Sequence, residues 1–350
     1  MAMKYLLHYY IGISLLLLFT GCTSQEKEEP MAVIGFQAIR MGSTRAELPT
    51  GTIVYPTDDE FVTTAFYLPV EKSWPENRGE ATTYIPQWPV SHSASTNTWG
   101  TTPVAYWPKV GRLTFFSYAP KTLGEKTEFS LNAENGLTLT NWNVTTYPDV
   151  DILVADVQAN VQGNRTTYLY NGVPTLFRHK LAKVGVKARL DVAPEAGSTD
   201  FIVVNKVTLT NIYTTGTYSL DGDDATAERW TVNTGTKESF VYEPAVEDTR
   251  LTASEQEIGK AKLMMPQHLL KDGTRPAPSL LVEYTTTNGT DTDTYTKEFE
   301  INTLSANTFW EMGHHIVYTL IFGTSDVDIE FDTSAEDWTD GNQDDIQVGV

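Results

Sequence analysis

The chain has 350 residues, of which 40% are hydrophobic and 20% are charged, so it can build a packed core and is not a disordered chain. Its formal net charge is −20, because 45 acidic residues outnumber 25 basic ones. A nucleic-acid-binding protein needs a basic surface, and an anionic membrane would repel this body. Composition therefore excludes nucleic acid as a partner and limits any membrane contact to a local, hydrophobic attachment.

The first residues have the features of an export signal. Lys4 provides a positive start, and residues 11–19 form an apolar run that is shorter than the roughly 20 residues of a transmembrane helix. The run ends in Leu-Phe-Thr-Gly-Cys, which resembles a bacterial lipobox with Cys22 as its cysteine. That resemblance implies that residues 1–21 are removed as a signal peptide and that Cys22 carries acyl chains for stable anchoring. The alternative is an ordinary signal peptide with an incidental cysteine.

A polar tether occupies residues 22–31. Its Lys27-Glu28-Glu29 resembles the acidic surface-export signal of Bacteroidetes lipoproteins. A plain solvated linker explains the same three residues equally well, so both interpretations stay open.

The rest of the chain predicts strands. Short β-rich or alternating segments recur between turn clusters of Gly, Pro, Asn and Asp. These segments cover residues 33–39, 113–118, 152–155, 183–190, 201–204, 206–210, 279–284 and 315–322. Helical spacing is weak and confined to residues 253–270, where Pro266 interrupts it. The pattern favours an all-β protein built from sandwiches over βαβ units.

A composition shift near residues 160–175 suggests a domain boundary. Most of the tryptophans precede it, whereas the clearest strands follow it. We therefore divide the mature chain into an N-terminal sandwich over residues 32–174 and a C-terminal sandwich over residues 175–350.

The sequence shows no catalytic or cofactor motif. His314 and His315 would point to opposite faces of a strand, so no shared metal is expected. The acidic segments 221–224 and 340–345 read as solvated turns rather than calcium loops. The Trp-rich first half, with Trp74, Trp88, Trp99 and Trp107, is better explained as core than as a carbohydrate platform. We expect no enzyme and no cofactor.

Several segments in order along the chain resemble the fimbrillins of Bacteroidales, the subunits of type V pili. They are Ile34-Gly-Phe36 with Ser43-Thr-Arg-Ala46, Tyr106-Trp107-Pro108 with the segment 113–120, Asp151-Ile-Leu-Val-Ala155, the segment 176–184, Tyr318-Thr-Leu320, and Asp337-Trp338-Thr-Asp-Gly341. One departure is Glu311-Met-Gly-His-His, where the family often has Pro-Gly-x-x-Tyr.

This resemblance implies a fold and a role. The fold would be two tandem transthyretin-like (immunoglobulin-like) β-sandwich domains. The role would be that of a structural subunit of a cell-surface fimbria, exported to the outer membrane as a lipoprotein and contributing to adhesion. Its partners would be other fimbrillin subunits, the membrane through the N-terminal lipid before processing, and an arginine-specific surface protease. A host glycan or protein stays open as a further partner.

In this family a protease removes the first strand, and a strand of a neighbouring subunit takes its place. Here Ile34, Phe36 and Ala38 alternate within the candidate removable strand, residues 32–39. The resemblance places the cut after Arg45 in Thr-Arg-Ala, with Arg40 as the second choice. The alternative is that residues 32–39 are a permanent edge strand.

The C-terminus offers a candidate donor strand. Ile346, Val348 and Val350 would share one face of an extended segment. The alternative is a frayed tail. A rival to the fimbrial role as a whole is a glycan-binding surface lipoprotein of a polysaccharide-uptake system that uses the Trp-rich loops.

The lipobox makes one prediction that can be tested directly. Cys22→Ser should abolish incorporation of a labelled fatty acid and release the protein from membranes, because the anchor would be lost. Metabolic acyl labelling and membrane fractionation measure both effects. Unchanged labelling of the variant would contradict the assignment of Cys22.

Overall fold

The computed structural model describes residues 31–41, 53–164, 172–220, 229–247, 249–271, 273, 275–304, 308–323 and 329–337. Its contacts divide the chain into two units, Met1–Ala32 and Val33–Val350. The second unit contains every described strand and is described here by itself. The described part is all-β, as the sequence predicted, with only three short helical turns, η1 (Arg78–Glu80), η2 (Lys121–Glu125) and α2 (Ile301–Leu304). None of these described helices is long and apolar enough to cross a membrane.

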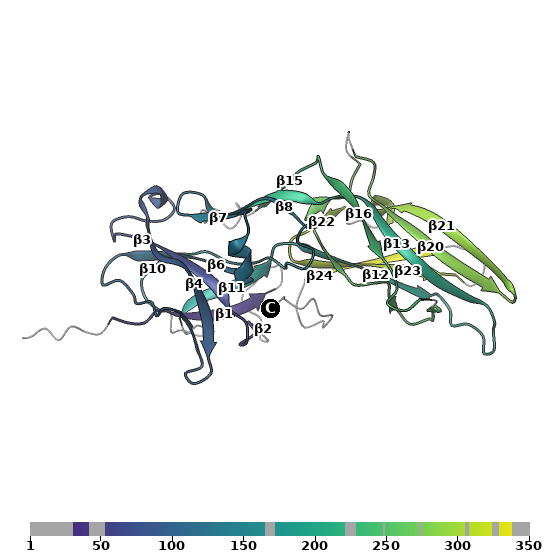
Figure 1. Cartoon of the computed structure of the whole chain (residues 1–350), viewed down its shortest axis with the longest axis horizontal. Coiled ribbons are helices and arrows are strands. Elements are labelled where there is room, and N and C mark those ends of the chain that lie inside the picture. The colour runs from purple at the N-terminus through teal and green to yellow at the C-terminus, as the bar shows by residue number, and fades with distance from the viewer. Residues whose placement is uncertain are drawn as a thin grey trace, which may run out of the picture. The chain divides into compact units, whose positions relative to one another are not determined.

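The first sheet is nine-stranded and closes on itself (Figure 1). Its strands are β1 (Gly35–Met41), β2 (Ile53–Val54), β3 (Phe61–Leu68), β4 (Thr82–Ser93), β5 (Thr98–Thr101), β6 (Arg112–Ala119), β9 (Leu153–Ala155), β10 (Gln158–Val161) and β11 (Val173–His179). Their order is β10-β6-β3-β4-β5-β1-β11-β9, with β2 paired to β1. Because β9 also pairs with β6, the ladder runs around a central apolar core.

A second sheet packs against the outside of the first. It has the order β15-β14-β8-β7 and consists of β7 (Phe129–Asn132), β8 (Gly136–Asn143), β14 (Thr215–Leu220) and β15 (Arg229–Val232). Phe66 and Phe116, on the outer faces of β3 and β6, form one core with Trp142 and Tyr218 of this sheet. Strands β3 and β6 are therefore buried on both faces, and their polar side chains Thr63, Thr64, Thr114 and Ser117 are buried with the apolar ones.

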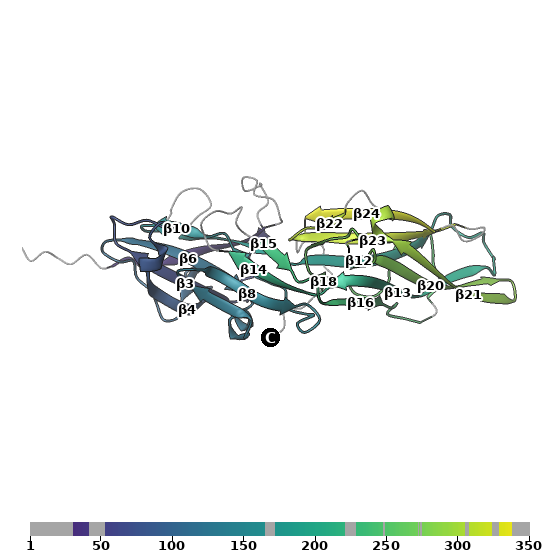
Figure 2. The ribbon, with the colours of Figure 1, turned by 90° about the horizontal axis from the view of Figure 1, so that it is seen from above.

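The remaining strands form two facing sheets and a small ribbon (Figure 2). One sheet has the order β17-β12-β23-β24, with β18 also on β12, and contains β12 (Ala182–Leu190), β17 (Gln256–Glu257), β18 (Lys262–Met264), β23 (His314–Phe322) and β24 (Ile329–Asp337). The other has the order β16-β13-β20-β21 and contains β13 (Phe201–Tyr213), β16 (Lys237–Tyr242), β20 (Ser279–Asn288) and β21 (Asp291–Glu300). The ribbon pairs β19 (Gln267–His268) with β22 (Phe309–Trp310). One apolar cluster fills the space between the facing sheets.

Every strand segment expected from the sequence is present. The segments 201–204 and 206–210 are one strand, β13, whose register shifts between Val204 and Lys206. The weakly helical region 253–270 instead forms the short strands β17, β18 and β19. The sheet β15-β14-β8-β7 draws strands from both sides of residue 174, so the two parts of the chain share it. The division at residue 174 stays a prediction.

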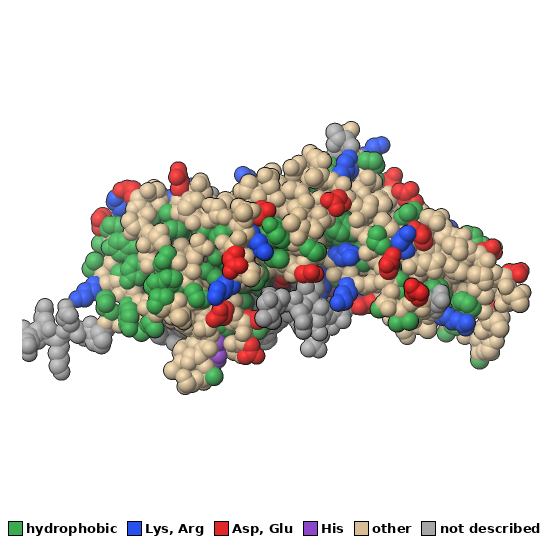
Figure 3. Space-filling model, viewed as in Figure 1, with side chains coloured by type: hydrophobic (Ala, Val, Ile, Leu, Met, Phe, Trp, Pro, Cys, Tyr) green, Lys and Arg blue, Asp and Glu red, His purple; other side chains and the backbone are tan. Residues whose placement is uncertain are grey.

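The surface carries charges of both signs. On the face shown in Figure 3, acidic and basic side chains are interspersed, while hydrophobic side chains gather over the region of β3 and β4. Exposed apolar residues in the connections between strands of the first sheet include Val70, Val104, Tyr106 and Val110.

A buried hydrogen bond gives a test of the second core. The indole Nε1 of Trp310 donates to the hydroxyl of Tyr318 at 3.0 Å, and both residues are only 1% exposed. Tyr318→Phe should lower the free energy of unfolding by about 1–3 kcal/mol, because a buried N–H would lose its acceptor. Urea unfolding measures the loss. Tyr295→Phe, at an exposed position of β21, serves as the control. Equal stability of the two variants would contradict the assignment.

Candidate functional site

Strand β1 lies inside the first sheet and has partners on both sides. It pairs in parallel with β11, from Phe36 opposite Val173 to Met41 opposite Arg178. On its other side it pairs antiparallel with β5 at Gly35 and Phe36 and with β2 at Ile39 and Arg40. The alternative of an edge strand is therefore wrong, because both ladders of β1 are used.

The side chains of this strand alternate as the sequence predicted. Ile34, Phe36 and Ala38 are at most 1% exposed and belong to the core inside the closed sheet. The ring of Phe36 packs edge-to-face on Phe61 and Phe115, with centroid distances of 6.0 and 5.8 Å. The first strand thus contributes to the centre of the core and does not merely cover it.

Aromatic rings line the rest of this core. Tyr55, which follows β2, packs on Phe177 of β11 at 4.9 Å and on Trp99 of β5 at 5.7 Å between ring centroids. Its backbone N–H donates to the carbonyl of Ala38 at 3.4 Å. The neighbours of β1, with Tyr55 after β2, would therefore present an apolar, aromatic groove if β1 were absent.

One side chain from a distant part of the chain holds the start of β1. The carbonyl oxygen of Asn164 accepts hydrogen bonds from the backbone N–H of Gly35 at 3.2 Å and from the indole of Trp107 at 3.0 Å. Its amide donates to the carbonyl of Val33 at 2.9 Å. Asn164 is a residue that the sequence analysis missed, because a lone asparagine between two strands resembles an ordinary turn residue.

Gly172 allows the backbones of β11 and β1 to approach closely. Its φ is +130°, and a Cβ at this position would lie 2.4 Å from the backbone of Gly35. Any side chain would push the first strand away, so the glycine is a steric requirement of this pairing.

The far end of β11 is held by an ion pair and a buried histidine–carboxylate contact. Arg178 donates from Nε and Nη2 to the two carboxylate oxygens of Asp156 at 2.9 and 3.0 Å. The Nδ1 of His179 lies 2.8 Å from an oxygen of Asp151, and both side chains are almost fully buried. His179 therefore has a structural role and keeps β11 in place beside β9.

Three of the four tryptophans considered as a carbohydrate platform are buried. Trp74, Trp99 and Trp107 are 3%, 5% and 7% exposed, and Trp88 is only partly exposed. A platform built from them is therefore excluded, and their assignment to the core is confirmed. The alternative failed because a long connection can fold its tryptophan inward while the loop itself stays at the surface.

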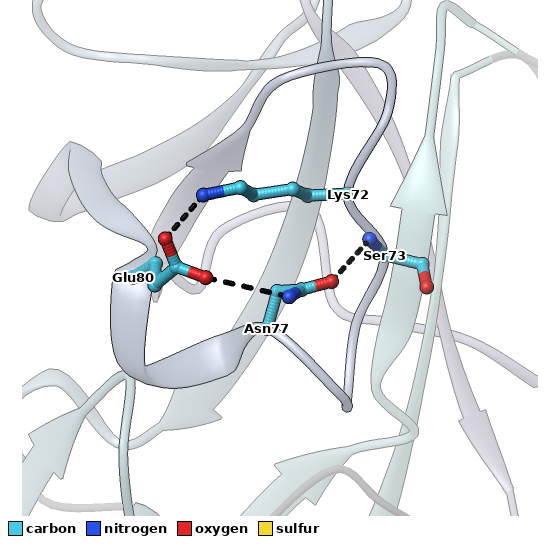
Figure 4. Close-up of polar contacts among 4 residues, drawn as sticks. All are labelled: Lys72, Ser73, Asn77 and Glu80. Carbon is cyan, nitrogen blue, oxygen red and sulfur yellow. Dashed lines mark hydrogen bonds and ion pairs between the residues drawn. The ribbon is translucent and has the colours of Figure 1, made fainter.

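The connection between β3 and β4 shows how this happens (Figure 4). Lys72 pairs with Glu80, Asn77 donates to the other oxygen of Glu80 at 3.4 Å, and its own carbonyl accepts the N–H of Ser73 at 3.2 Å. The Lys72 ammonium lowers the pKa of the Glu80 carboxyl below its usual value. This exposed network shapes the loop so that Trp74 turns inward.

The indole of Trp74 then stacks on Phe66 at 5.9 Å between ring centroids. Its backbone exchanges two hydrogen bonds of 2.9 Å with the side chain of Asn160.

The adjacent histidines of β23 behave as a strand predicts. His314 and His315 line two different pockets, so their side chains serve opposite sides of the strand. Among the described residues no three His, Cys, Asp or Glu side chains gather as metal ligands.

Of the predicted lipidation, processing and donor-strand residues, the structure describes only Arg40. The backbone of Arg40 lies within β1 and pairs with Phe177 and Ile53. Cys22, Arg45 and the tail residues Ile346, Val348 and Val350 lie outside the described residues.

The role of Asn164 can be measured. Asn164→Ala should speed hydrogen exchange at the amides that begin β1 and lower the free energy of unfolding by about 1 kcal/mol. The reason is that the start of the strand loses its hydrogen bonds to the Asn164 side chain. Asn233→Ala, which removes a local contact to Gly235, is the matched control. Unchanged exchange at Gly35 and Phe36 would show that Asn164 does not hold the strand.

One solved structure has the same overall fold. A fimbrial protein from Bacteroides vulgatus is similar at 17% identity with a TM-score of 0.58, over 88% of this chain and 99% of that one. A protein from Bacteroides uniformis, proposed to act in cell adhesion, has 16% identity and a TM-score of 0.49, over 89% and 100% of the two chains. No curated protein matches. The sequence profile of the fimbrillin-like family covers residues 72–338, and the chain belongs to that family.

Proposed function

We propose that the chain is a structural subunit of a cell-surface fimbria that assembles by strand exchange and contributes to adhesion. In this account it reaches the outer membrane as a lipoprotein on Cys22, and an arginine-specific protease then removes its first strand. The body is proposed to consist of two tandem transthyretin-like sandwiches. The observation that supports the proposal most strongly is the position of β1, which is paired on both sides and fills the core.

Removal of β1 would leave backbone hydrogen-bonding groups unpaired and would expose apolar side chains to water. The ladder groups of β11 and β5 that now pair with β1 would lose their partners, and the aromatic groove would be exposed to water. Burying a side chain such as Ile or Phe contributes about 1.5–3 kcal/mol, so the empty groove is strongly unfavourable. An incoming strand pairs with the free ladder groups and covers the apolar groove, which is the basis of recognition by strand addition.

The structure favours Arg45 over Arg40 as the cleavage site. Arg40 pairs with Phe177 on one side and with Ile53 on the other, so its peptide bond is held within a sheet. A protease needs an unpaired, extended segment, and backbone that is paired on both sides does not supply one. Arg45 falls between the end of β1 at Met41 and the start of β2 at Ile53. A cut there would separate all of β1 from the remaining body.

The proposed donor is the C-terminal segment. The groove accepts Ile34, Phe36 and Ala38 at alternate positions. Ile346, Val348 and Val350 repeat that period of two in the sequence, so an extended tail would present one apolar face to the same groove. The tail belongs to the proposal and lies outside the described residues.

Processing gives the central test. Digestion of the purified chain with an arginine-specific protease should yield a stable core that begins at Ala46 and forms oligomers. Arg45→Lys should block both effects, whereas Arg78→Lys, in the exposed turn η1, should block neither. N-terminal sequencing and size-exclusion chromatography provide the readouts. A core that begins at Ala46 and stays monomeric at high concentration would overturn the assembly role.

A further inference from the structure

A pocket of about 890 Å³ lies outside the strand groove and has its own chemistry. Its lining comes from β15, from the ribbon β19–β22 and from the segment that follows β19. The volume falls within the range of about 300–1,000 Å³ that is typical of small-ligand sites. We propose that this pocket binds an acidic sugar residue.

The side chains at the floor of the pocket are buried and hydrogen-bonded. Gln267 and Arg275 are each 2% exposed. Gln267 exchanges hydrogen bonds of 3.0 and 2.9 Å with the backbone of Tyr213 and accepts another from Arg275 at 3.0 Å. Arg275 also donates to the carbonyls of His268 and Leu270 at 2.7 and 2.9 Å and lies over the ring of Tyr213. These bonds fix the floor in advance, which lowers the entropic cost of binding.

Aromatic side chains form the walls. The indole of Trp230 is held by a hydrogen bond of 2.6 Å to the carbonyl of Lys180 and by packing on Tyr218. Phe309 of β22 packs on His268 of β19 at 4.6 Å between ring centroids. Trp230 and Phe309 are only partly buried, so ring surface stays available inside the pocket. Such surfaces pack against the apolar C–H face of a sugar ring.

The described residues that line the pocket carry mostly positive charge. Among them, Arg229, Lys271 and Arg275 are basic and Glu311 is the single carboxylate. The whole chain, by contrast, has 45 acidic and 25 basic residues. A local excess of positive charge therefore selects an anionic ligand.

Two of these cations are available to a ligand. Within the described part of the chain, the side chains of Arg229 and Lys271 are exposed and make no hydrogen bond or ion pair. An arginine fork and a lysine ammonium at one rim suit a carboxylate, which accepts charge-assisted hydrogen bonds from both.

The combination favours an acidic sugar over other anions. Inorganic phosphate has no apolar face for Trp230 and Phe309. An extended acidic peptide would exceed a compact pocket, which suits one or two rings. The inference does not rest on fimbrial assembly, because none of these residues belongs to β1 or to the groove around it.

Calorimetric titration of the full-length, uncleaved chain tests the proposal with 3′-sialyllactose and trigalacturonic acid as probes. Lactose, inorganic phosphate and hexaglutamate are the comparison ligands. At least one acidic sugar should bind, and R229Q/K271Q should weaken that binding at least about tenfold. Phe309→Leu should weaken it several-fold by removing ring surface. K121Q/K126Q, which removes the same charge at residues that do not line the pocket, should leave binding unchanged.

Other outcomes would overturn the proposal. They are no binding of either acidic sugar, equal binding of lactose and sialyllactose, binding of phosphate or hexaglutamate alone, or full affinity in R229Q/K271Q. Circular dichroism of each variant shows that a loss of binding is not a loss of fold.

Discussion

The closed first sheet depends on the pairing of β1 between β5 and β11. This strand connects the two halves of the ladder, and its Phe36 packs on Phe61 of β3 and Phe115 of β6 across the core. Asn164 holds its start, and Gly172 lets β11 approach. In the proposed mechanism, a strand of the same period from another subunit replaces β1, because it would satisfy the same ladder and fill the same groove.

Much of this fold follows from the sequence because strands have a simple signature. The alternation of Ile34, Phe36 and Ala38 predicted their burial, and the predicted strand segment 113–118 lies within β6. The adjacent His314 and His315 likewise took the two faces of β23. In each case the prediction depends only on neighbouring residues in the sequence and does not require knowledge of which strands pair.

The partners themselves could not be predicted. Whether β1 is an edge or an inner strand depends on β11, whose residues are more than a hundred positions away, and no local pattern encodes that pairing. The hydrogen bonds of Asn164 to the start of β1 and the close approach of Gly172 to Gly35 are also non-local. The sharing of one sheet by strands β8 and β14 shows the same limit, because a composition shift near residue 174 says nothing of which strands pair.

The proposed sugar pocket was missed for a related reason. Its parts are Arg229 and Trp230 on β15, Lys271 after β19 and Phe309 on β22, which the fold gathers from separate segments. Of the four tryptophans that stood out in the sequence, three are buried and Trp88 packs against the core, whereas Trp230 lines the pocket. Assembly and ligand binding would thus use different surfaces of one chain.

Hydrogen exchange at those amides of β11 that face β1 tests the replacement of β1 most directly. The account predicts slow exchange in the intact chain, fast exchange in the dilute core from which the first strand has been removed, and slow exchange again in the oligomers that the core forms. Oligomers in which these amides still exchange fast would contradict it, because the groove would then remain empty.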